Sequence, residues 1–176
     1  MNTIVITGST KGLGFALARG FRAQGHHVVV TGRTDAAVNA AVASLTETPG
    51  AGRVLGRAVD VSDPDATTAL WSFAVAELGR VDIWINNAGV AHTTNPIVDT
   101  TPDAVRAMVT TNMLGTIFST QAAVRGMTAQ GGGSCSTCSV VAATARPAPT
   151  WACTAPPSAV STCSRGPWSR RSTAPA

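Results

Sequence analysis

A glycine-rich segment near the start of the chain has the residue types that bind phosphate groups. It runs Thr7-Gly8-Ser9-Thr10-Lys11-Gly12-Leu13-Gly14, follows the apolar run Ile4-Val5-Ile6, and precedes an apolar-periodic stretch from Phe15 to Phe21. Strand, glycine turn and helix is the order that a dinucleotide needs, because glycines let the backbone approach a pyrophosphate and the helix start offers free N–H groups. The segment therefore predicts a dinucleotide site formed by Gly8, Ser9, Thr10, Lys11, Gly12, Leu13 and Gly14.

Three further motifs follow in sequence. Asp60-Val61 ends a predicted third strand, Asn86-Asn87-Ala88-Gly89 ends a fourth, and Asn112 lies within the predicted helical stretch Val109-Thr110-Thr111-Asn112-Met113-Leu114-Gly115. Together with the spacing Thr-Gly-x-x-x-Gly-x-Gly, they resemble the short-chain dehydrogenase/reductase family from residue 1 to about residue 130. The alternative is an unrelated doubly wound domain, in which Asn112 would make only local hydrogen bonds.

The resemblance implies roles for these residues. Asp60 and Val61 would contact the adenine, Asn87, Ala88 and Gly89 would complete the cofactor site, and Asn112 would be catalytic, holding a water on a proton relay. The family moves hydride between a nicotinamide and a small carbonyl or alcohol substrate, and its members tend to form homo-oligomers. The stretches 82–89 and 110–115 look similar to chlorophyll b reductase-type members.

The charges at the end of the second predicted strand favour NADP over NAD. An acidic residue there would bind the ribose 2′-hydroxyl of NAD, but the strand ends Thr31-Gly32-Arg33, and Asp35 falls in the next helix. Lys11, the chain's only lysine, lies within the glycine segment. We expect Lys11 and Arg33 to flank a 2′-phosphate; the alternative is that both are solvated surface cations.

The elements that must position these residues alternate along the chain. Apolar runs predict strands at 4–6, 28–31, 53–59 and 81–85, and helices are predicted at 34–45, 62–78 and 101–127. This alternation predicts an α/β, Rossmann-like, doubly wound parallel sheet with helices on both faces. A fifth strand is expected after Gly133 but polar residues follow, so the sheet is expected to be incomplete at its C-terminal side.

The composition changes abruptly after the glycine run 131–133. Residues 1–133 hold all nine acidic residues and nine basic ones, whereas residues 134–176 hold four arginines, all four cysteines, six of the ten prolines and no Leu, Ile, Phe or Met. We therefore expect an NADP-binding domain at 1–133 and an aberrant, disordered tail at 134–176. The pI near 9.4 comes from that tail, so it does not indicate nucleic-acid binding.

Two observations bear on partners and location. No apolar run is long enough to span a membrane and no secretion signal is visible, so we expect a cytoplasmic protein without membrane contacts. Cys135-x-x-Cys138 with Cys153 and Cys163 could bind zinc or form a redox pair, but the second pair is ten residues apart and the tail lacks apolar residues to frame a site. We therefore expect no metal.

The second half of the family's active site is missing from the sequence. The resemblance calls for a Tyr and, four residues later, a Lys, but the chain has no tyrosine and no lysine after Lys11. Ser139 falls near the family's catalytic serine, and His92 is either substrate-facing or a plain loop residue. The chain as printed is thus expected to be inactive, an alternative being a non-catalytic nucleotide-binding remnant.

A shifted reading frame is our hypothesis for the tail. Its motivation is that the neighbouring frame across residues 151–158 permits the string Gly-Val-Tyr-Gly-Ala-Thr-Lys, which contains the missing pair. The coding DNA tests it, because a neighbouring frame without Tyr-x-x-x-Lys would refute the shift.

Overall fold

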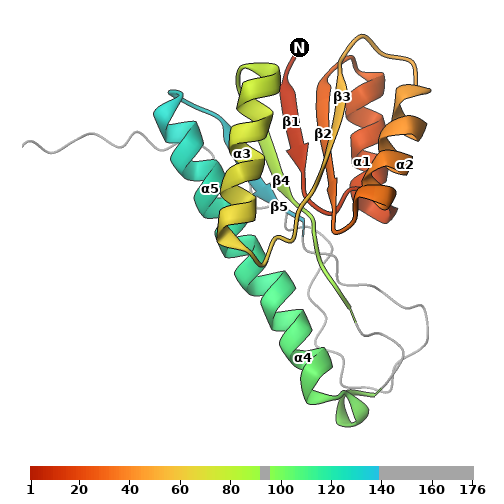
Figure 1. Ribbon diagram of the computed structural model, residues 1–176, viewed down its shortest axis with the longest axis vertical. Coiled ribbons are helices and arrows are strands. Elements are labelled where there is room, and N and C mark those ends of the chain that lie inside the picture. Colours follow the sequence, from red (N-terminus) through yellow and green to blue (C-terminus); the bar gives the residue numbers. More distant parts are fainter. Residues whose placement is uncertain (92–95, 139–176) are drawn as a thin grey trace, which may run out of the picture.

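The computed structural model describes residues 1–91 and 96–138, which form one layered α/β unit (Figure 1). Five parallel strands pair in the order β3-β2-β1-β4-β5. Their bounds are β1 Thr3–Ile6, β2 His27–Gly32, β3 Val54–Ala58, β4 Ile83–Asn86 and β5 Ser134–Thr137. The helices are α1 Gly12–Ala23, α2 Asp35–Thr46, α3 Pro64–Leu78, α4 Pro102–Met108 and α5 Gly115–Ala129, with a 3-10 turn at Ile97–Asp99. The predicted doubly wound parallel sheet is confirmed.

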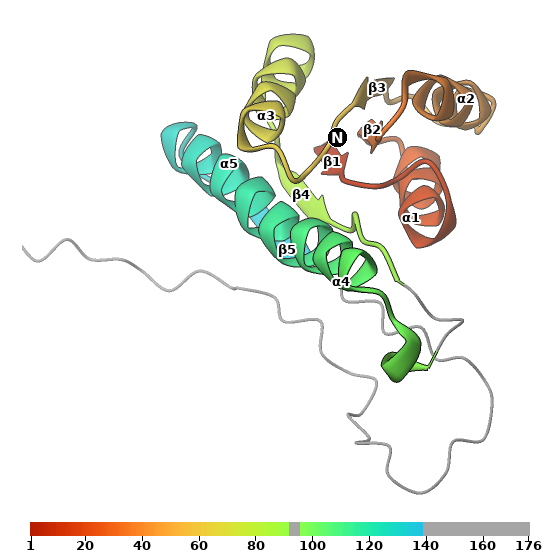
Figure 2. The ribbon, with the colours of Figure 1, turned by 60° about the horizontal axis from the view of Figure 1, so that its bottom comes forward.

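Helices cover the sheet on both faces (Figure 2), which explains why the central strands are apolar throughout. On one face, Ile4 and Val28 join a cluster with Ala18 of α1 and Leu45 of α2. On the other face, a second cluster joins Val5 and Trp84 to residues of α3 and α5. Alternate residues of one strand therefore supply two separate cores, and the strands are held rigidly between them.

Local sequence signals set where the helices begin and end. The Asp63 side chain caps α3 by accepting from the N–H groups of Asp65 and Ala66, and Pro64 follows at the first helical position. Thr101 caps α4 in the same way before Pro102. Helix α3 ends at Gly79, whose φ of 83° suits glycine.

The helix predicted at 101–127 is one continuous rod with an irregular middle. Between α4 and α5 the segment Val109–Leu114 is π-helical, and the rod projects beyond the sheet (Figure 1). Neither α4 nor the π-helical segment contributes a buried side chain, and Val109 and Met113 are exposed. Among the described residues, no helix is both long enough and apolar enough to cross a lipid bilayer.

The prediction that the fifth strand is missing is wrong. Strand β5 pairs with β4 from Ile83↔Ser134 to Asn86↔Thr137. Hydrogen bonds from Ser134 N to Asp82 O and from Cys138 N to Asn86 O, both 2.8 Å, extend the pairing at either end. Main-chain bonds hold the strand, and Cys135 packs on the core beneath α5. The ordered sheet thus continues past residue 133, the long helix keeps its partner strand, and β4 is not an edge.

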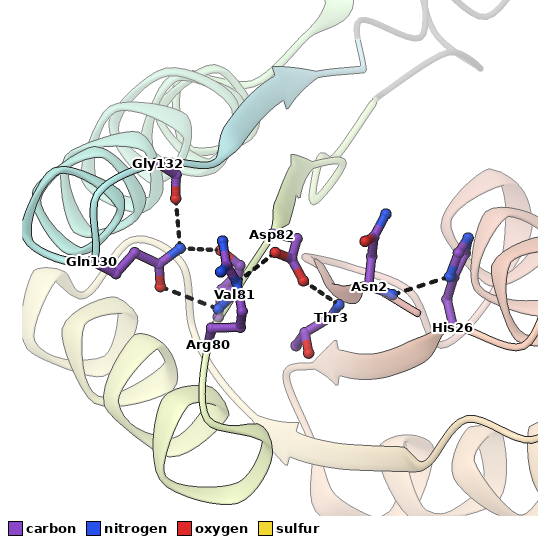
Figure 3. Close-up of polar contacts among 8 residues, drawn as sticks. All are labelled: Asn2, Thr3, His26, Arg80, Val81, Asp82, Gln130 and Gly132. Carbon is purple, nitrogen blue, oxygen red and sulfur yellow. Dashed lines mark hydrogen bonds and ion pairs between the residues drawn. The ribbon is translucent and has the colours of Figure 1, made fainter.

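Side-chain contacts join neighbouring strands at their amino ends (Figure 3). The Gln130 amide accepts from Val81 N (3.3 Å) and donates to Val81 O (2.6 Å) and Gly132 O (2.7 Å). The Asp82 carboxylate accepts from Thr3 N at 2.8 Å and contacts Arg80 at 2.6 Å. These contacts fix the register of β1, β4 and β5 at the strand ends opposite the glycine turn.

The two histidines at the start of β2 bond to main chain on either side. His26 Nδ1 accepts from Asn2 N at 3.2 Å, and His27 Nδ1 accepts from Arg53 N at 2.8 Å. Figure 3 shows the hydrogen bond between Asn2 and His26.

Candidate functional site

The glycine turn between β1 and α1 is shaped by two close approaches. Gly8 has a φ of 63°, and a Cβ there would lie 2.6 Å from the Ala88 Cα. A Cβ on Gly14 would lie 2.7 Å from Gly8 O and would also strike the Asn87 amide. The turn can therefore fold against the end of β4 only because these residues lack side chains.

The outer side of the turn is open. Gly12 has a φ of 59°, and a Cβ there would meet nothing within 4 Å. The N-cap residue, Lys11, provides no side-chain cap to the first turn of α1. Backbone N–H groups at the start of a helix with space before them can hold an anion. The cradle thus fits a dinucleotide pyrophosphate.

Thr7 joins the glycine turn to the end of β4. Its Oγ1 accepts from the N–H groups of Asn87 and Ala88, both at 3.0 Å. The Asn87 side chain donates in return to Thr7 O (3.0 Å) and Gly8 O (2.9 Å). The structure thus brings the Asn87-Ala88-Gly89 motif onto the glycine turn. Sequence reasoning did not list Thr7 as a site residue, although it is the first residue of the glycine motif.

Charged residues lie at the start of α1 and just after β2 and β3. Lys11 and Arg33 are both exposed. Asp60 accepts from the hydroxyl (2.7 Å) and the N–H (2.9 Å) of Ser62, and these bonds, more than the nearby Arg33, lower the pKa of its carboxyl. The Asp60 carboxylate therefore lies near the Arg33 guanidinium at the carboxyl ends of the strands.

Val61 takes a different position from Asp60. It is 6% exposed, and a Cβ on Gly115 would lie 2.6 Å from its Cγ2. Its side chain is therefore part of the packing between the β3 end and α5. Only its backbone remains for the adenine contact that the resemblance implies.

Asn112 sits in the π-helical segment and binds the loop that follows β4. Its Oδ1 accepts from Val90 N at 2.8 Å, and its Nδ2 donates to Val90 O at 2.9 Å. Its backbone carbonyl accepts from Thr116 Oγ1 at 2.7 Å. Both the oxygen and the nitrogen of the side-chain amide are thus engaged by Val90. Single-turn π-helical insertions are frequent at functional sites.

Several predicted residues lie outside the described residues, namely His92, Ser139, Cys153 and Cys163. The remaining cysteines, Cys135 and Cys138, pack against opposite faces of the sheet. Cys135 packs on the core beneath α3 and α5, whereas Cys138 packs on the opposite one, and burial raises the pKa of the Cys138 thiol. Within residues 1–91 and 96–138, no group of three His, Cys, Asp or Glu side chains is placed to hold a metal ion.

Comparison with known proteins gives one consistent answer. The family described as short chain dehydrogenase matches residues 2–156. A probable chlorophyll(ide) b reductase of Arabidopsis thaliana, NYC1, is 37% identical over 145 residues, which are 74% of this chain and 29% of that protein. The chlorophyll(ide) b reductase NOL of Oryza sativa subsp. japonica is 39% identical over 125 residues, which are 70% and 36%.

Solved structures agree with the curated relatives. A short-chain type dehydrogenase/reductase from Mycobacterium marinum superposes with a TM-score of 0.71 at 28% identity, covering 77% of this chain and 54% of that one. The chain therefore spans about a third of the curated relatives and about half of this structural one.

Proposed function

The chain belongs to the short-chain dehydrogenase family, and from that premise we propose that the carboxyl edge of its sheet binds NADP. The observation that supports binding is the close approach of Gly8 to Ala88 beneath an uncapped helix start, which leaves a cradle for the pyrophosphate. The family makes NAD or NADP the cofactor; the preference for NADP is our proposal.

The preference rests on charge at the end of β2. Thr34 is the N-cap of α2 and Asp35 its first residue, so Asp35 belongs to the helix start. The residue that follows the last residue of β2 is Arg33, and Lys11 lies at the start of α1. Two exposed cations suit the two negative charges of a 2′-phosphate, whereas a 2′-hydroxyl would call for an acceptor.

The family's reaction is hydride transfer between the nicotinamide and a small carbonyl or alcohol, and we assign to this chain the part of the site that binds the dinucleotide. The cofactor, when bound, supplies the hydride. The chain's own contribution is to hold the glycine turn in shape through Asn87, so that the helix start faces the dinucleotide, and to fix the loop at Val90 through Asn112. The names of the curated relatives, chlorophyll(ide) b reductases, favour reduction of a carbonyl as the direction.

The printed sequence lacks the groups that would move the proton. It has no tyrosine, and Lys11, its only lysine, lies in the glycine turn. Without an acid to protonate the substrate oxygen, transfer should be slower by a factor of about 10² to 10⁴. We therefore propose that this chain binds the dinucleotide and does not turn it over.

Calorimetric titration with NADPH and NADH tests the binding proposal. We expect NADPH to bind more tightly by a factor of roughly 10, and replacing Arg33 by Ala to remove most of that difference, because a charge-assisted bond contributes about 1.5–3 kcal/mol. The absence of binding by either nucleotide would refute the site, and equal binding would refute the NADP preference.

Oxidation of NADPH in the presence of carbonyl compounds tests the second half of the proposal. We expect no turnover from the chain as printed. Clear substrate-dependent oxidation would overturn the proposal that it only binds.

A further inference from the structure

The glycine turn stays paired with the end of β2 after β1 itself has ended. Ser9 N donates to Thr31 O at 2.8 Å, and Thr31 N donates to Ser9 Oγ at 3.0 Å. Gly8 N donates to Thr31 Oγ1 at 3.1 Å. Ser9 and Thr31 are fully buried, so these bonds are shielded from water. The turn and the strand end are therefore held at a fixed spacing.

The next residues, Thr10 after Ser9 and Gly32 after Thr31, leave no room for a side chain at position 32. A Cβ on Gly32 would lie 2.6 Å from Thr10 Cγ2 and 3.3 Å from Thr10 Oγ1. The Thr10 side chain thus occupies the space in which a side chain at position 32 would stand. Gly32 cannot move away easily, because its carbonyl accepts from Val59 N at 2.8 Å and the residue pairs with Ala58.

One residue further along each segment is a cation. Lys11 follows Thr10, and Arg33 follows Gly32, so the pairing Ser9 with Thr31 and the contact of Thr10 with Gly32 lead directly to these two side chains. We propose that the contact between Thr10 and Gly32 sets the spacing of Lys11 and Arg33, and so makes Gly32 a positioning residue for recognition of a 2′-phosphate. This inference rests on the proposed NADP binding and deepens it.

A methyl-exchange cycle tests the contact. Gly32→Ala adds a methyl group where Thr10 Cγ2 lies, and Thr10→Ser removes that Cγ2 while keeping the hydroxyl. We expect Gly32→Ala to lower the ratio of NADPH to NADH affinity at least about fivefold, since Lys11 and Arg33 are forced apart while the pyrophosphate cradle remains. We expect the double variant to recover most of the ratio, because the methyl group has only changed sides. Non-additivity of this kind is typical of residues in contact.

The matched control is Gly20→Ala on α1, where a Cβ would meet nothing within 4 Å. It should leave both affinities unchanged. Thermal melting of each variant reports folding, and a purely structural role for Gly32 would lower both affinities together and leave their ratio intact. If Gly32→Ala does not fold, Thr10→Ser is the reference: because it loses the contact, we expect it to lower the ratio and the double variant to raise it again. A ratio no higher in the double variant than in Thr10→Ser overturns the inference.

The outcomes separate the inference from the proposed function. If the parent chain binds NADPH and NADH equally, the NADP preference falls and the inference falls with it. If the parent prefers NADPH and Gly32→Ala keeps that preference, the inference alone is overturned. A lowered ratio that Thr10→Ser does not restore also overturns it, because the steric contact would not be the cause.

Discussion

The side chain of Asn112 forms two hydrogen bonds with one residue, donating to the carbonyl of Val90 and accepting from its N–H. A helix that projects from the sheet is thereby tied to the loop after β4. We expect Asn112→Leu to cost about 0.5–1.5 kcal/mol in unfolding free energy, because each partner is near solvent and water replaces part of the loss. Urea denaturation measures this change. Gln121→Leu, at an exposed position of α5, is the control and should have little effect.

Thr7 offers a sharper test of the link between β1 and β4. Thr7→Val keeps the shape but removes the acceptor for the N–H groups of Asn87 and Ala88. We expect a loss of about 2 kcal/mol or more in unfolding free energy, since Thr7 is buried and these N–H groups lose their partner. Thr7→Ser keeps the hydroxyl and should retain most of the stability; equal losses in both variants would contradict the hydrogen-bond account.

The Asp60 carboxylate is expected to make part of the unfolding free energy depend on pH in the acid range. Bonds from Ser62 lower the pKa of its carboxyl in the folded chain. A lowered folded-state pKa contributes stability above the unfolded value, near 3.9, and this contribution disappears as the pH falls through the folded-state pKa. Asp60→Asn should therefore lose less stability than the parent as the pH falls from 6 to below the unfolded-state pKa, near 3.9. Denaturant midpoints across that range measure the difference, and Ser62→Ala should resemble Asp60→Asn.

Strand β5 predicts a pattern of amide exchange. Ser134 N and Cys138 N donate to carbonyls of the Asp82–Asn86 segment, so both should exchange slowly. Gly133, which lies in the preceding turn, should exchange faster. Hydrogen exchange read by NMR tests this; fast exchange at both Ser134 and Cys138 would show that the fifth strand does not form.

The Gln130 side chain is expected to stabilise the fold at the amino ends of the strands, away from the glycine turn. Gln130→Leu leaves the N–H and carbonyl of buried Val81 without their amide partner, and we expect a loss of about 1–3 kcal/mol in unfolding free energy. Dinucleotide affinity, measured by calorimetry, should stay the same because the two edges are separated by the length of the strands. A parallel fall in affinity would contradict that separation.

The early part of the fold follows closely from its residues. The apolar runs at 4–6 and 28–30 became fully buried central strands, and Asp63-Pro64 and Thr101-Pro102 began helices as capping chemistry predicts. The glycine motif lies at the turn because two of its residues lack the side chains that would collide with β4 and with the turn itself.

The parts that the sequence did not predict have a common physical cause. Strand β5 carries Ser134, Cys135, Ser136 and Thr137, and a pattern of side chains says little about a strand held mainly by main-chain bonds to a preformed neighbour. The two hydrogen bonds between Asn112 and Val90 depend on a π-helical turn. The spacing of apolar residues does not reveal such a turn. The pairing of Ser9 with Thr31 is likewise a contact between residues 22 positions apart.

The hydrogen bonds of Gln130, Asp82 and His26 lie at the amino ends of the strands, and the dinucleotide cradle lies at their carboxyl ends. The contacts at the amino ends of the strands thus form one set of stabilising positions. The residues of the dinucleotide cradle form a second set, at the opposite ends of the strands. A directed-evolution library confined to the first set could vary the melting temperature over a wide range, while the second set continued to present the same surface to its nucleotide.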